Sequence, residues 1–122
     1  MEMEGTVEPH RIQNVSRVER IAQLNDALRK TGKGGRLVIT RGLRALAGFS
    51  ALDLLKAVSE YDAFDPMKDP HGERDLGFFE YLGCEVLWKI DYYDRELHFG
   101  SDDAADSNMT MRVLTILLAE EY

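Results

Sequence analysis

The stretch that most constrains the fold runs from Cys84 to Tyr93, where apolar and polar residues largely alternate. Successive side chains of a strand point to opposite faces of a sheet. The residues that would share the apolar face are Cys84, Val86, Trp88, Ile90 and Tyr92. The opposite face would carry Glu85, Lys89 and Asp91, with Leu87 and Tyr93 among them. The pattern predicts a long strand with one face in the core.

Aromatic residues around this strand indicate a hairpin near residues 78–99. Phe78 to Tyr81 predicts a preceding strand, with Leu82 and Gly83 as the turn. Past a second turn near Asp94, the segment from Glu96 to Phe99 predicts a third antiparallel strand. A strand at one end of such a sheet is also able to pair with another chain.

Two helices are marked by their ends. Ser16 and Glu19 have the spacing of a capping box, and Gly32 stands where a glycine C-cap is expected, so the first helix should span Arg17 to Lys30. Ser50 is positioned to cap the second helix. The apolar stripe of that second helix consists of Ala51, Leu54, Leu55, Val58 and Tyr61.

Two apolar segments complete the expected fold. Residues 37–40 predict a short buried strand by composition. Residues 113–119 are apolar nearly all round, which favours a buried C-terminal helix, with a buried strand as the competing interpretation. We therefore expect an α+β fold: a mostly antiparallel sheet of three to four strands with two to three helices packed on one face. Residues 1–14 should be a flexible tail and residues 15–122 a single domain.

Charge is distributed unevenly along the chain, whose net charge is −7. Residues 1–48 carry nine Lys/Arg against five Asp/Glu, a net +4, and residues 49–122 carry six against seventeen, a net −11. The acidic start and the absence of any apolar run near the roughly 20 residues that span a bilayer favour a cytoplasmic location without membrane contact.

Motifs for cofactors or nucleophilic catalysis are lacking. The glycines of residues 31–35 follow a helix and precede a strand, the reverse of a phosphate-binding loop, so no cofactor is expected. Cys84 is the single cysteine, which excludes an internal disulfide and is typical of a small buried apolar residue.

Polar residues near the hairpin supply the candidate sites. His71, Glu73 and Asp75 alternate in a long loop, residues 62–75, and have side chains able to bind a metal, although turn and cap formation is the simpler role. Lys89 and Asp91 share one strand face, and His98 or Glu96 would lie across from them if the third strand paired in register. That group could perform acid–base catalysis, or it could be a cross-strand ion-pair ladder.

Two further residues are candidates for binding. Tyr93 falls among charges on the polar strand face, as aromatic residues at partner-binding surfaces often do. Arg41 belongs to a basic group around residues 30–44, which could contact nucleic acid, but the acidic character of the whole chain makes direct nucleic-acid binding a weak prediction.

Four blocks of sequence resemble a family of small bacterial proteins known only as a domain of unknown function. The blocks run from Gly35 to Gly42, Asp69 to Gly77, Trp88 to Asp94 and Arg112 to Tyr122. The resemblance implies a cytoplasmic bacterial protein carried on mobile elements. It brings no activity, cofactor or catalytic residue.

Two classes of function follow. The first is a non-catalytic module that binds another protein; its most specific version inhibits a nucleic-acid-handling defence enzyme, with the acidic surface as a phosphate decoy. The second is a small enzyme or a ligand- or metal-binding protein, with its site between the 62–75 loop and the 84–99 hairpin.

Overall fold

The computed structural model describes residues 15–122, and the tail expected at residues 1–14 lies outside them. The strands are β1 (Gly35–Ile39), β2 (Leu76–Tyr81), β3 (Cys84–Tyr93) and β4 (Met111–Leu118). The helices are α2 (Arg17–Thr31), α3 (Arg41–Arg44) and α4 (Ala51–Glu60), followed at the end by a 3₁₀ turn, η1 (Ala119–Glu121). The chain therefore has the α+β fold that the sequence predicted.

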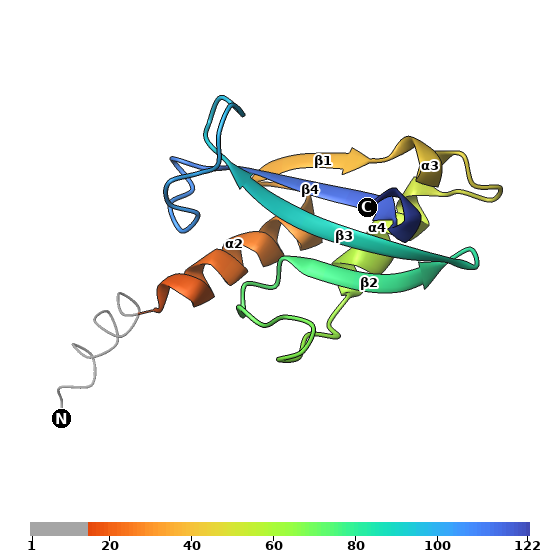
Figure 1. Cartoon of the computed structure of the whole chain (residues 1–122), viewed down its shortest axis with the longest axis horizontal. Helices are drawn as coiled ribbons and strands as arrows, with labels where there is room; N and C mark the ends of the chain where they lie inside the picture. Colours follow the sequence, from red (N-terminus) through yellow and green to blue (C-terminus); the bar gives the residue numbers. More distant parts are fainter. Residues whose placement is uncertain (1–14) are drawn as a thin grey trace.

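One sheet contains all four strands, in the order β1-β4-β3-β2. The pairs β2–β3 and β3–β4 are antiparallel, whereas β1 runs parallel to β4. The parallel pair joins an early strand to the last one, so the two central strands are β3 and β4. Figure 1 shows α3 and η1 at one end of the sheet and the 94–110 segment at the other.

Both long helices begin at the predicted serine caps. The hydroxyl of Ser16 accepts a hydrogen bond from the backbone N–H of Glu19, and the hydroxyl of Ser50 accepts one from that of Asp53. Gly32 ends α2 in the left-handed region with φ of 77°, as a glycine C-cap requires. Leu82 and Gly83 also have positive φ, 53° and 79°, which matches the two-residue turn of a tight hairpin.

The core lies between the sheet and the helices. The alternate residues of β3 that were predicted to face it do so, and Trp88 at their centre is fully buried. From the helix side, Leu28 of α2, Leu43 of α3 and Leu54 of α4 pack into the same cluster. All three helices thus contribute to one face of the sheet.

The C-terminal apolar segment is a strand, so the prediction of a helix over residues 113–119 is wrong. Leu114 and Ile116 of β4 point into the helix-side core, while Leu117 is buried on the other face. On the face away from the helices Val113 and Thr115 are half-buried, so apolar residues occupy consecutive positions of β4 although its burial partly alternates. Such an apolar run lacks the sequence alternation that identifies a half-exposed strand.

Two other strand predictions need correction. Residues 96–99 form a turn in place of a third hairpin strand, held by Asp94, whose carboxylate accepts hydrogen bonds from the backbone N–H groups of Glu96 and His98. The strand near residues 37–40 exists as β1, but it is not buried: Leu37 and Val38 are 42% and 44% exposed. Its place at the edge of the sheet explains this exposure.

Within the described residues, none of the helices combines the length and the apolar character that crossing a membrane would require.

Candidate interaction surface

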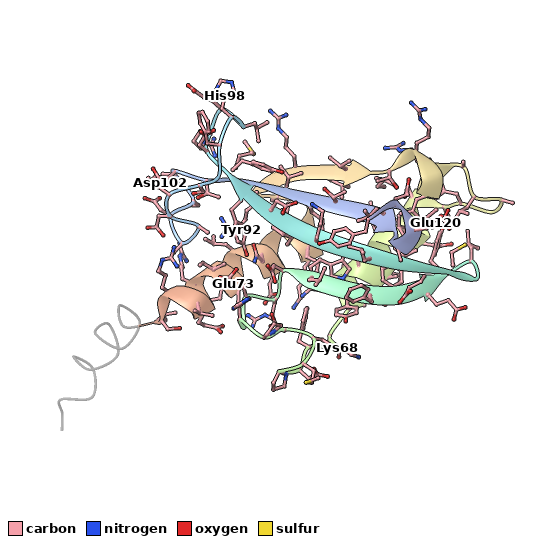
Figure 2. All side chains as sticks on the ribbon, viewed as in Figure 1. Lys68, Glu73, Tyr92, His98, Asp102 and Glu120 are labelled. Atoms are coloured by element: carbon pink, nitrogen blue, oxygen red, sulfur yellow. The ribbon has the colours of Figure 1, made fainter. Side chains whose placement is uncertain are left out.

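The predicted catalytic group does not assemble. Lys89 and Asp91 pair with each other on the sheet face opposite the helices, and both side chains are partly exposed. Across the sheet, Lys89 is flanked by Leu76 and Thr115. His98 lies in the exposed turn beyond β3, where its Nδ1 is 3.8 Å from Glu96 Oε1 (Figure 2). Lys89 and Asp91 therefore form an ion pair within one strand, and neither pairs with a charged residue of a neighbouring strand as the predicted cross-strand ladder would require.

The 62–75 loop packs on the other side of the sheet, against the helices. Tyr92, on the helix-facing side of β3, donates a hydrogen bond of 2.8 Å to the Glu73 carboxylate (Figure 2). Asn25 of α2 donates to the Glu73 carbonyl oxygen and to the Tyr92 hydroxyl, over 3.0 and 2.8 Å. These contacts give Glu73 a structural role in fixing the loop to α2.

A buried cation completes this network. Arg112 of β4 is 2% exposed, and its Nε donates to Asn25 Oδ1 over 2.8 Å. Its guanidinium also donates to the Ala104 carbonyl oxygen and lies over the Tyr92 ring. Burial raises the pKa of the Tyr92 phenol well above its ordinary value, so the hydroxyl remains a donor to Glu73.

A second ion cluster holds the same loop. Arg74 binds Asp26 at 2.8 Å and Glu19 at 3.3 Å, and Arg29 binds Asp26 at 2.9 Å. Burial alone would raise the pKa of Asp26, but hydrogen bonds from the two guanidinium groups outweigh it and hold that pKa below its ordinary value. The loop is thus tied to α2 by two adjacent polar clusters.

The sheet separates the loop from Lys89 and Asp91, so the structure does not bring together the site predicted between them. His71 is exposed, and the adjacent Gly72 lies against Val18 of α2. Burial raises the pKa of the Asp75 carboxyl, and the nearby charge of Glu73 adds to the rise. In residues 15–122, His, Cys, Asp and Glu side chains form no group of three or more suited to a metal ion.

An apolar groove opens beside β1, on the helix side of the sheet. Its volume is about 440 Å³, and its apolar lining comes from α2, β1, α4 and β4: Leu28, Leu37, Leu52, Leu55 and Leu114. Leu52 is 78% exposed, an unusual position for a leucine on a helix that has a well-formed apolar stripe elsewhere. Lys30 and Lys56, both exposed, also line the groove.

The groove lies directly against an unpaired strand edge. Among the described strands, β1 pairs only with β4, which leaves its other edge without a neighbouring strand. The side chain of Arg44 donates to the Ile39 carbonyl oxygen over 3.0 Å and covers one end of this edge. The other backbone groups of β1 that point away from β4, those of Gly35 and Leu37, are open to another strand.

Basic residues surround this edge. Residues 27–52 contain six Lys/Arg and no Asp/Glu. Arg29 is buried, and the five exposed cations are Lys30, Lys33, Arg36, Arg41 and Arg44. Within residues 15–122 none of these five forms an ion pair. The predicted binding residue Arg41 therefore belongs to this surface, whereas Tyr93 lies half-buried at the far end of β3.

The sequence predictions missed the groove because it is built from four elements distant along the chain. One signal did precede it: Leu52 falls outside the apolar stripe of α4. A large apolar residue on the polar side of an amphipathic helix indicates either chance exposure or a contact surface. We call the β1 edge, the groove and the five exposed cations the β1 surface.

Comparison with known proteins identifies a family without an assigned activity. No curated protein and no solved structure matches the chain significantly. A family described as "Protein of unknown function (DUF3768)" matches residues 39–121, from the end of β1 through η1. Because this match covers well over half of the 122 residues, the chain belongs to the DUF3768 family of proteins of unknown function.

Proposed function

We propose that this protein is a non-catalytic interaction module that binds another protein at the β1 surface. The observation that carries the proposal is the groove beside a free strand edge. A strand added to β1 would gain backbone hydrogen bonds, and its helix-facing side chains would enter the apolar groove. The proposal places both proteins in the cytoplasm and needs no cofactor.

The alternative of an enzyme site between loop and hairpin has less support. Its candidate groups lie on opposite faces of the sheet, and the residues nearest the loop are engaged in structural hydrogen bonds. A phosphate-decoy inhibitor would need one continuous acidic strip. The carboxylates of residues 49–122 are instead divided among separate places: five lie in the 62–75 loop, Glu80, Glu85 and Glu120 lie near the start of β3, and Asp94, Asp102 and Asp103 lie beyond its end.

A comparative capture experiment tests the proposal. The purified chain, a groove variant, Leu52→Asp, and a control variant, Met67→Asp, are each immobilised and exposed to lysate of the native cells. Both residues are exposed, so neither change should unfold the protein. Met67 belongs to the 62–75 loop, which makes the control a test of the alternative site as well.

The expected result is a protein retained by the wild type and by Met67→Asp but lost with Leu52→Asp. Retention by all three variants would place the contact elsewhere and contradict the proposal. Loss with Met67→Asp alone would move the binding site to the loop.

A further inference from the structure

We infer that the partner segment accepted at the β1 surface is an extended acidic strand with apolar residues at alternate positions. This inference rests on the function proposed above and specifies its ligand. Three features of the surface carry it: the length of the free edge, the side of the sheet on which the groove opens, and the sign of the surrounding charge.

The edge and the groove together define the pattern of the ligand. Leu37 of β1 and Leu114 of β4 are register partners, and both line the groove. In a strand added beside Leu37, only every second side chain would point to this face of the sheet. The ligand should therefore carry apolar residues two positions apart, over a segment comparable in length to the five-residue β1.

The charge of the β1 surface predicts which residues stand between the apolar residues of the ligand. Five exposed cations of residues 30–44 and the exposed Lys56 surround the edge and the groove. The nearest carboxylate of the C-terminal segment, Glu121, is already bound: it accepts hydrogen bonds from the Thr40 hydroxyl and from the backbone N–H of Gly42. Carboxylates of the ligand would thus meet cations that lack ion-pair partners within residues 15–122.

The β1 surface argues against two other occupants. Pairing of two β1 edges from two copies of the chain would bring the same cations against each other, which is unfavourable. A nucleic acid would satisfy the cations but would leave the leucines of the groove uncovered.

Synthetic peptides test the inference on the full chain. The first probe is an eight-residue peptide that alternates glutamate with leucine or valine. The second replaces each glutamate by lysine, and the third keeps the glutamates but replaces the apolar residues by serine. Binding is measured by fluorescence anisotropy at low salt, and the site is located by backbone amide shifts and hydrogen exchange of β1 by NMR.

We expect the first peptide to bind at least about tenfold more tightly than either of the others, with weakening as salt is added. Its binding should slow amide exchange within β1. In the double variant Lys30→Glu, Lys56→Glu, the preference for the glutamate peptide over the lysine peptide should shrink, because two of the six cations are replaced by carboxylates. The control Lys68→Glu changes an exposed lysine of the 62–75 loop, away from the groove, and should leave the preference unchanged (Figure 2).

The outcomes separate this inference from the proposed function. Equal affinity for the glutamate and lysine peptides would overturn the acidic ligand and leave the β1 surface intact. Failure of all three peptides, with capture still dependent on Leu52, would overturn the extended alternating ligand alone. A single-stranded RNA that displaces the first peptide and slows amide exchange within β1 would also contradict the inference of an acidic peptide ligand. Dimerisation of the free chain through β1 would identify a second copy as the occupant.

Discussion

Replacing Asn25 by alanine should cost a large part of the free energy of folding. Asn25 is fully buried and makes three hydrogen bonds: it donates to the Glu73 carbonyl oxygen and the Tyr92 hydroxyl, and it accepts from Arg112 Nε. Alanine makes none of them. The groups left behind lie in the interior, so water does not readily replace the lost partner.

The magnitude follows from those three groups. An unpaired nitrogen on the buried guanidinium of Arg112 should cost about 2 kcal/mol, and the unpaired Glu73 carbonyl about 1 kcal/mol. The Tyr92 hydroxyl keeps Glu73 as its acceptor and should add only about 0.5 kcal/mol. We therefore expect Asn25→Ala to lower the free energy of unfolding by about 3–4 kcal/mol, against a total of about 5–15 kcal/mol for a domain of this size.

Urea denaturation provides the assay, because Trp88 is the single tryptophan and is fully buried. With a slope of about 2 kcal/mol per molar, the midpoint should fall by about 1.5–2 M urea. The control Gln23→Ala changes an exposed residue of the same helix and should shift the urea midpoint little. A loss below about 1 kcal/mol for Asn25→Ala, with an unchanged slope, would refute the assigned role of the network.

A double variant tests whether the network acts as a unit. Tyr92→Phe removes the hydroxyl that accepts from Asn25 and donates to Glu73. Because the two residues share a hydrogen bond, the loss in the double variant should be smaller than the sum of the two single losses. Strict additivity would indicate that the two side chains contribute independently.

Two further predictions concern packing and pH. Gly77→Ala should destabilise the protein by several kcal/mol in the same assay, because the added Cβ would lie 2.3 Å from Trp88 Nε1. The control Gly100→Ala should be tolerated, since the nearest atom to its added Cβ would be 3.9 Å away. Equal stability of the two variants would contradict this packing. The lowered pKa of Asp26 means that its carboxylate adds stability above the unfolded aspartate pKa of about 3.9, and that this contribution is lost as the pH falls through the lower folded value. The difference in unfolding free energy between the wild type and Asp26→Asn should therefore shrink as the pH falls below about 4, and a difference independent of pH would disprove the assignment.

The parts of the fold that the sequence predicted are those governed by local rules. Serine caps and an apolar stripe identified α2 and α4, and alternation identified β3 and the face it buries. The segment at residues 113–119 was misassigned because its apolar residues stand at consecutive positions, and such a run has no periodicity to distinguish a strand from a buried helix. The exposure of β1 depends on its neighbours in the sheet, which composition does not encode.

The candidate sites likewise depend on long-range contacts that local sequence rules do not predict. Chemistry alone grouped Lys89 with His98, but the turn at residues 96–99 carries His98 away from the sheet face. Likewise, nothing local distinguished Arg112 from a surface arginine, although it is buried and bound to a residue of α2 from the opposite half of the chain. Long-range contacts of this kind lie beyond the reach of spacing rules.

The parallel pairing of β1 with β4 also has a consequence for biosynthesis. More than half of the chain lies between these two strands, and β4 occupies a central position in the sheet. During translation, β1 and the β2–β3 hairpin emerge before the strand that must lie between them, so neither can complete its hydrogen bonding until β4 has also emerged. Formation of the sheet should therefore wait for β4 and be limited by its late insertion.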